Sequence, residues 1–139
     1  MSNILKISEA ASLGMHAMAL LAKDPERLVS TGEIASILEV SEAHLSKVLQ
    51  RLQRSGYVQS TRGPRGGFSL AKSPSRITLL DIFEALEGPL RPSNCLLHNT
   101  VCHEGGCILG GLLETVNKNV KDHLAGTKLS DLNGTYGNS

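Results

Sequence analysis

Two short helical segments, 30–38 and 41–54, stand only two residues apart, and this spacing constrains the fold of the 139-residue chain more than any other feature. Each segment starts at a serine that can cap a helix, and the first has the capping-box pattern Ser30-x-x-Glu33. Apolar residues recur in the second segment at the spacing of one helical face, and Gly56 can end it in the left-handed conformation. The pattern predicts two helices that meet across a tight turn.

A glycine-rich hairpin is predicted directly after these helices. Residues 57–62 and 68–71 alternate in character like two short strands on either side of a Gly-Pro-Arg-Gly-Gly turn at 63–67. Glycine permits turn geometry that a side chain would forbid. We therefore predict a mainly α chain with a small β wing, a winged helix-turn-helix.

Three further helices are expected to flank this unit. Residues 8–22 have a helical period behind a serine cap, and Thr78-x-x-Asp81 is a second capping box, whose helix ends at a Gly-Pro pair. Residues 108–124 have the period of a long amphipathic helix, and the chain offers few other elements to cover its apolar face. We expect a second copy of the chain to cover it.

The expected organisation has four parts. They are a winged helix-turn-helix DNA-binding domain over 1–89, a cysteine-containing sensory loop over 90–107, a dimerisation helix and C-terminal segment over 108–132, and a flexible tail over 133–139.

The net charge of +1 conceals an uneven distribution of charge. No Asp or Glu lies between Ala43 and Leu80, although this stretch holds half of the 14 basic side chains. Basic groups on a helix and a hairpin can neutralise phosphates and reach into a groove of the duplex. We predict double-stranded DNA as the partner. The predicted contact residues are His44, Ser46, Lys47, Gln50, Arg51, Arg62, Pro64, Arg65 and Gly66.

Other features of the sequence exclude several classes of protein. No apolar run approaches the roughly 18 residues of a membrane span, and the first residues lack the pattern of a secretory signal. We therefore expect a cytoplasmic protein with no membrane partner. Cys102 and His103 are neighbours, but no orienting group or oxyanion-hole signature accompanies them, so we expect no enzyme.

All three cysteines fall in one loop, as Cys95-x6-Cys102-x4-Cys107. Thiolates are soft ligands that suit iron–sulfur clusters or zinc, and a flexible loop can bring three of them to one centre. The paired C-x2-C spacing of a zinc knuckle is absent. The alternative is that the three are simply small buried side chains, although the histidines and glycines around them form a polar setting.

Two motifs, RGPRGGF at 62–68 and ITLLDIFEALEGP at 77–89, are the most specific parts of a resemblance that extends over nearly the whole chain. In these motifs the chain resembles the Rrf2 family of bacterial winged-helix regulators, whose members include regulators of iron–sulfur biogenesis, nitric-oxide response and cysteine metabolism. The resemblance implies a homodimer whose long C-terminal helices cross, two heads on one palindromic operator, and DNA contacts at Ser46, Lys47 and Arg62.

The resemblance also implies a cofactor. Cluster-bearing members carry three cysteines in this loop, often with spacings of x5 and x5 instead of the x6 and x4 found here. It implies an iron–sulfur cluster, 2Fe-2S or 4Fe-4S, on Cys95, Cys102 and Cys107. The first candidate for the fourth ligand is His16 of the first helix, from the partner subunit; Glu9 of that helix and His103 of the loop are weaker candidates.

These observations favour a homodimeric bacterial repressor whose cluster senses redox state, iron–sulfur status or nitric oxide. Two alternatives remain open from the sequence. One is a regulator of the same fold without a cluster, which senses through thiols, persulfides or zinc. The other is a partner protein of a metabolic enzyme that does not bind DNA.

Overall fold

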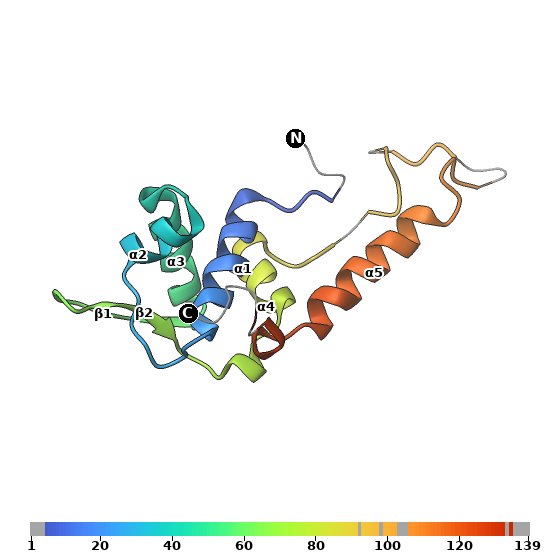
Figure 1. Ribbon diagram of the computed structural model, residues 1–139. Helices are drawn as coiled ribbons and strands as arrows, with labels where there is room; N and C mark the ends of the chain where they lie inside the picture. Colours follow the sequence, from blue (N-terminus) through green and yellow to red (C-terminus); the bar gives the residue numbers. More distant parts are fainter. Residues whose placement is uncertain (1–4, 92, 98, 103–105, 133, 135–139) are drawn as a thin grey trace.

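A computed structural model describes residues 5–91, 93–97, 99–102, 106–132 and 134 (Figure 1). The elements are α1 (Glu9–Ala22), α2 (Thr31–Leu38), α3 (Glu42–Arg54), β1 (Val58–Thr61), β2 (Gly67–Leu70), the 3-10 turn η1 (Pro74–Arg76), α4 (Leu79–Glu87), α5 (Leu112–Gly126) and the 3-10 turn η2 (Leu129–Leu132). The mainly helical fold and the winged helix-turn-helix are confirmed. None of the helices built from described residues has the length and apolar character that a bilayer span requires.

Most of the helix starts agree with the predicted caps. The hydroxyls of Ser8, Ser30 and Ser41 each accept a backbone N–H at the N-terminus of their helix. At α4 both halves of the capping box form, with Thr78 N–H donating to Asp81 Oδ2 at 3.0 Å and Asp81 N–H donating to Thr78 Oγ1 at 3.1 Å. These local bonds satisfy N–H groups that a helix leaves without intrahelical partners.

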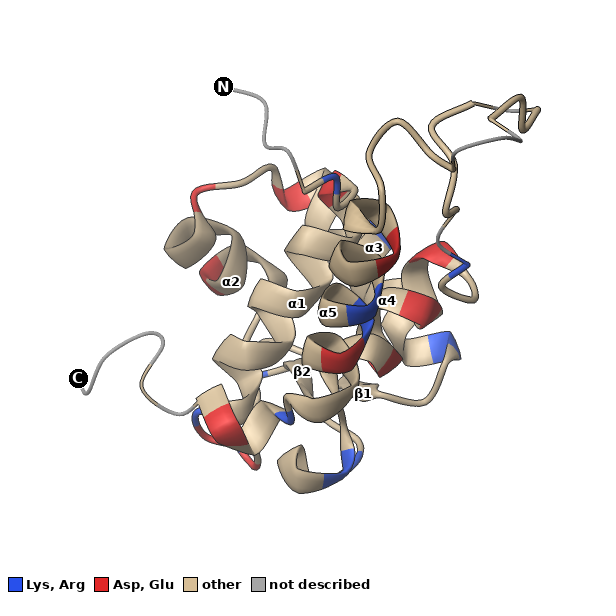
Figure 2. Ribbon diagram, turned by 90° about the vertical axis from the view of Figure 1, so that its right-hand side faces the viewer, with Lys and Arg blue, Asp and Glu red and all other residues tan. Residues whose placement is uncertain are grey.

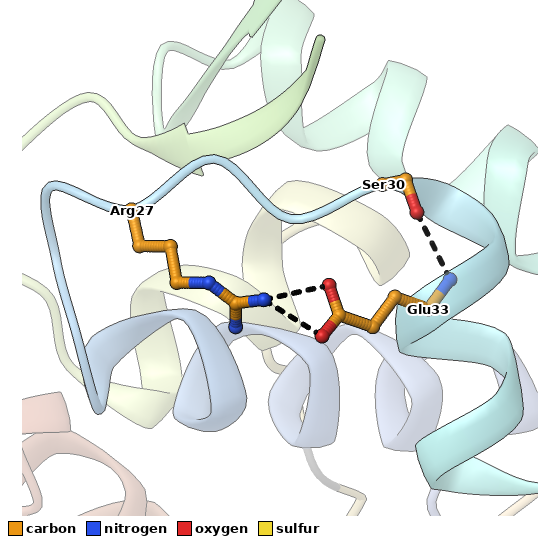
Figure 3. A network of polar contacts seen from close by, with 3 residues as sticks. All are labelled: Arg27, Ser30 and Glu33. Carbon is orange, nitrogen blue, oxygen red and sulfur yellow. Dashed lines mark hydrogen bonds and ion pairs between the residues drawn. The ribbon is translucent and has the colours of Figure 1, made fainter. Parts of the chain in front are cut away.

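The capping box predicted at Ser30 is only half present (Figure 3). Glu33 N–H donates to Ser30 Oγ at 3.1 Å. The Glu33 carboxylate, however, accepts two hydrogen bonds from Arg27, at 2.8 and 3.1 Å, instead of returning to the Ser30 backbone. This hydrogen bond and the attraction to the carboxylate raise the pKa of Arg27 above its ordinary value. A charged donor in the preceding loop thus replaces the neutral backbone donor.

Residues 5–87, from the segment before α1 to the end of α4, are called the head below. Helix α1 lies at its centre, in contact with α2, α3, α4 and β2. The face that it turns to α4 has small side chains, and a Cβ on Gly14 would lie 2.3 Å from Leu86 Cδ1 and 3.3 Å from Ile82 Cγ2. The absence of a side chain at this position therefore lets α4 approach α1 closely. The largest fully buried side chains around α1 are Met18, Leu21, Ile34, Leu45, Leu49, Leu52, Ile77, Ile82 and Leu129.

The wing begins where α3 ends. Gly56, with φ +85°, donates to Gln53 O at 3.0 Å, and Tyr57 N–H donates to Leu52 O at 3.0 Å, which is the hydrogen-bond pattern of a Schellman cap. The antiparallel strands pair from Val58 opposite Leu70 to Thr61 opposite Gly67. They are each close to the predicted ranges of 57–62 and 68–71.

The wing is held to the head by a contact that the sequence did not indicate. Val29 forms an isolated bridge with Phe68, through hydrogen bonds of 2.9 and 2.8 Å in the two directions. Gly67 lies beside this bridge, where an added Cβ would be 2.6 Å from the backbone of Val29. The segment before α2 therefore pairs with β2 close to the turn of the wing.

The predicted start of the last helix, at residue 108, is wrong by four residues. Residues 108–111 form turns and α5 begins at Leu112. Gly110 has φ +62°, and Gly111 precedes the helix without a side-chain cap, so two glycines interrupt an apolar period that continues upstream. Of the predicted tail over 133–139, only Gly134 lies within the described residues.

Helix α5 is joined to the head at its C-terminal end. Leu79 N–H donates to Thr127 O at 3.0 Å, and Leu129 N–H donates to Ile77 O at 2.9 Å. From this attachment α5 extends away from the head, and the wing projects in the opposite direction (Figure 1). Leu124 is the one buried residue of this helix in the described chain.

We expect Gly67→Ala to destabilise the fold by more than about 2 kcal/mol, because its Cβ would meet backbone atoms that cannot move aside without breaking the Val29 bridge. Gly32→Ala is the matched control, since a Cβ there meets only the Glu42 carboxylate at 3.7 Å. A gain of about 0.5–1 kcal/mol is expected from the better helix propensity of alanine. Urea denaturation measures both, and equal effects would contradict the close approach at Gly67.

Candidate functional site

The outward face of α3 carries the polar residues that the sequence singled out. Its buried stripe consists of Leu45, Val48, Leu49 and Leu52. His44, Lys47, Gln50 and Arg51 are exposed, and Ser46 is partly exposed. The helix thus presents donors and acceptors of a length that reaches base edges in a major groove.

Two of these side chains contact neighbouring helices. His44 Nδ1 lies 3.7 Å from Glu9 Oε1 at the start of α1. The guanidinium of Arg51 donates to the backbone oxygen of Leu86 in the last turn of α4. Arg54, which the predicted contact residues did not include, is exposed one turn beyond Gln50 on the outward face. Its helical spacing from Lys47 and Gln50 is the signal that would have identified it.

The wing tip holds the remaining predicted contact residues. Arg62, Pro64 and Arg65 are exposed and Gly66 is partly exposed. Gly66 N–H donates to Gly63 O at 2.9 Å, and a Cβ on Gly66 would lie 2.0 Å from Thr61 O. Only glycine therefore fits this turn, which presents two arginines at the end of a hairpin.

The base of the wing places one more basic group. Lys72 Nζ lies 4.8 Å from the centre of the Tyr57 ring, within the range of a cation–π contact. Partial burial raises the pKa of the Tyr57 hydroxyl, and the nearby carboxylates of Asp81 and Glu84 add to the effect. This contact links the residue before β1 to the second residue after β2.

Charge is distributed differently at the two ends of the molecule. On the face that Figure 2 presents, acidic and basic positions are mixed along α4 and α5. From Ala43 to Leu80, which includes most of α3 and the whole wing, no acidic residue occurs. Basic groups clustered along a helix and a hairpin are the electrostatic footprint expected of a DNA-binding element.

The loop between α4 and α5 brings the three cysteines around one hollow. Cys95, Cys102 and Cys107 are free thiols, partly exposed, and they line a cavity of about 390 Å³ together with Ser93, Asn94 and Thr100. Within the described residues, no three His, Cys, Asp or Glu side chains are close enough together to hold a metal ion. His103 lies outside the described residues.

Two of the sulfurs accept backbone hydrogen bonds. Leu97 N–H donates to Cys95 Sγ and Leu109 N–H donates to Cys107 Sγ, each at 3.4 Å. Hydrogen bonds of this kind to thiolate ligands help to set the potential of iron–sulfur clusters. Cys95 and Cys107 thus already have the N–H···S hydrogen bonds that accompany cysteine ligands of such clusters.

Asn117 attaches the start of this loop to α5. Its amide nitrogen donates to Ser93 O at 2.8 Å and to Asn94 Oδ1 at 3.1 Å. Ser93 Oγ in turn accepts a hydrogen bond from Cys95 N–H at 3.1 Å. One side chain of α5 thus bonds to the segment from which the cysteine loop begins.

The candidate fourth ligands on α1 lie elsewhere. His16 is exposed, and its Nδ1 lies 2.7 Å from Ser12 O, so the ring donates from Nδ1 and has its acceptor at Nε2. Metal-binding histidines commonly have this tautomer, with one ring nitrogen bonded to a carbonyl. Figures 1 and 2 agree that the cysteine loop lies away from α1 of the same chain. Neither His16 nor Glu9 is brought to the cysteines within one protomer.

Comparison with known proteins shows a family, a relative and two similar solved structures. Residues 7–134 match the model of the family described as "Rrf2: Iron-dependent Transcriptional regulator". A protein of Aquifex aeolicus named as an HTH-type transcriptional regulator is 37% identical over 128 residues, which cover 90% of this chain and 89% of the relative.

Two solved structures are similar in fold and sequence. CymR (YrzC), the global cysteine regulator of B. subtilis, is 33% identical with a TM-score of 0.79, over 97% of this chain and 100% of that structure. IscR of T. potens is 31% identical with a TM-score of 0.72, over 93% of this chain and 86% of that structure.

We expect Asn117→Ala to release the start of the cysteine loop. The change removes two neutral hydrogen bonds, each worth about 1 kcal/mol, so the amide of Cys95 should exchange with solvent at least about fivefold faster. Asn119→Ala is the matched control, since this residue is exposed on the same helix. Hydrogen exchange read by mass spectrometry or NMR checks the difference. Equal rates in the two variants would show that Asn117 does not hold the loop.

Proposed function

Because the chain belongs to the Rrf2 family of transcriptional regulators, we propose that it acts as a homodimeric repressor that binds a palindromic operator through α3 and the wing. Family members and similar solved structures are transcriptional regulators, which are not enzymes. The observation that carries the proposal is the acid-free stretch from α3 through the wing, with exposed basic groups on both.

The proposed DNA contacts divide into two groups. Ser46, Lys47 and Gln50 lie along the outward face of α3 and would reach base edges or adjacent phosphates. Arg62 and Arg65 are exposed at the wing tip, where Pro64 and Gly66 shape the turn, and would enter the neighbouring minor groove. His44, one turn before Lys47 on the same face and 3.7 Å from Glu9, would add a contact at the start of α3.

The second copy would pack against α5. Ile108, Leu112 and Val116 are 81%, 55% and 42% exposed, although they are large apolar side chains. They adjoin a mostly apolar hollow of about 550 Å³ between α5, α4 and the segment before α1. Burial of such a face stabilises association by about 25 cal/mol for each Å² of apolar surface removed from water. A homodimer satisfies this face symmetrically.

The residues of the loop fit an iron–sulfur cluster in their chemistry. Three thiols line one hollow, and two of the sulfurs accept backbone N–H groups. Cys95, Cys102 and Cys107 would hold the cluster, with His16 or Glu9 of the partner subunit as the fourth ligand. A bound cluster supplies a centre that reacts with oxidants or nitric oxide. The chain's own contribution is the loop, which connects α4 to α5.

A regulator without a cluster is the second candidate. Two observations favour it: no described group of three ligands is preformed, and the similarity extends to a protein named as a global cysteine regulator. In that case the three cysteines would respond as thiols, persulfides or zinc ligands. Conditions in the cytoplasm keep such thiols reduced until a signal arrives.

Lys47→Ala should weaken binding to any duplex and reduce the salt dependence. A lost phosphate contact lowers the slope of log K against log salt by about 0.9. Lys121→Ala is the control, because Lys121 is exposed on α5, outside α3 and the wing. Fluorescence anisotropy over a series of salt concentrations measures the slopes. If the unaltered protein binds no duplex at low salt, DNA binding is excluded, and a partner protein of a metabolic enzyme becomes the better reading.

Anaerobic incubation with iron and sulfide should give a coloured protein whose absorption is lost in the Cys95→Ser, Cys102→Ser and Cys107→Ser variants. His16→Ala should shift the spectrum or lower the iron content if the partner's histidine is a ligand, whereas His123→Ala on α5 should not. Iron and sulfide analysis gives the number of iron and sulfide ions bound to each protomer. Absence of bound iron in the unaltered protein would favour the thiol-based regulator.

A further inference from the structure

The last turn of α4 is held by hydrogen bonds to three parts of the chain. Arg51 of α3 donates to Leu86 O, and Ser8 of α1 donates to the Glu87 carboxylate. From the cysteine loop side, Leu90 N–H donates to Glu84 Oε2 at 3.0 Å. This turn is therefore the point where the first helix, the proposed reading helix and the start of the cysteine loop meet.

The hydrogen bond from Arg51 depends on whether the last turn of α4 is formed, because its acceptor is a backbone oxygen of that turn. The final carbonyl groups of a helix lack intrahelical partners, and a cation beside them interacts favourably with the helix dipole. Gly88, with φ +85°, ends α4 immediately after Glu87, and Cys95 follows seven residues later. A pull on the loop that opened this last turn would move the oxygen to which Arg51 donates.

The packing between α1 and α3 is incomplete, so a movement of the Leu86 oxygen could change the position of α3. A hollow of about 350 Å³ separates the start of α1 from α3 and is lined by Glu9, Ala10, Leu13, His44, Lys47, Val48 and Arg51. Two polar contacts cross this region, the Glu9–His44 pair and the bond from Arg51. These contacts, one near each end of α3, add to the packing of its buried stripe in setting the orientation of the helix.

We propose that Arg51 is a positioning residue that couples the cysteine loop to the reading helix, and that it is not a DNA contact. This inference rests on the proposed function. It assigns to Arg51 a different role from the one that the charge pattern of α3 suggests. When the last turn of α4 is intact, Arg51 holds α3 in one orientation, and opening of that turn releases it.

The test uses Arg51→Met, which retains the apolar stem and removes the donors. Arg54→Met is the matched control, because it removes the same charge from the exposed face of the same helix. All three cysteines of the chain lie in the loop. Alkylation of the thiols of the reduced apo protein with iodoacetamide therefore modifies cysteines only in this loop. Binding is measured to a duplex that the unaltered protein has selected from a randomised pool.

Alkylation should change the operator affinity of the unaltered protein by about fivefold or more, the lower end of typical allosteric couplings. The change should fall to within about twofold in Arg51→Met and persist in Arg54→Met. The salt slope of Arg51→Met should equal that of the unaltered protein, since no phosphate contact is lost. Circular dichroism and thermal unfolding verify that the variants are folded.

Three results would overturn the inference while leaving DNA binding intact. They are a full alkylation response in Arg51→Met, a salt slope reduced by about 0.9 in that variant, or no alkylation response in the unaltered protein. Hydrogen exchange gives a readout without DNA, since alkylation should speed exchange in α3 only when Arg51 is present. Failure of the unaltered protein to bind any duplex would instead remove the proposed function, and the inference with it.

Discussion

The close approach of α4 to α1 at Gly14 is the packing constraint on which the head depends. A side chain at this position would meet Leu86 and Ile82, the two buried residues of α4. With α4 held against α1, its last turn comes within reach of Arg51 on α3. The absence of a side chain at Gly14 thus bears on how closely α4, from which the chain continues towards the cysteines, packs beside α1 and α3.

Much of the head could be predicted because its signals are local. A serine cap or a Thr-x-x-Asp box depends on residues three apart, and these bonds form at the expected helix starts. The exception at Glu33 arises because Arg27, six residues earlier, is brought back by the loop between α1 and α2. No local pattern indicates that return. The start of α5 was placed too early because two glycines, and not a change of apolar period, interrupt the helix.

The candidate site was predictable in composition but not in arrangement. Three cysteines in one short loop are visible in the sequence, and they do line a common hollow. The partner of Arg51 lies 35 residues away, so its bond to Leu86 depends on tertiary packing. In the same way, the tautomer of His16 follows from the helical carbonyl of Ser12, which spacing alone does not assign. The role of a basic residue on a reading helix therefore needs the three-dimensional structure.

Backbone hydrogen bonds hold the C-terminal end of α5, so a small rotation at that end displaces the other end by a larger distance. Its 15 residues are about 22 Å long, its C-terminal end is bonded to the strand-like residues before α4, and the cysteine loop is tied to its side near the other end. A rotation of about 5° at the attached end would displace the far end by about 2 Å at this length. In the proposed dimer, a small change in the loop would therefore correspond to a rotation of the whole head, and two heads bound in successive grooves would tolerate little rotation.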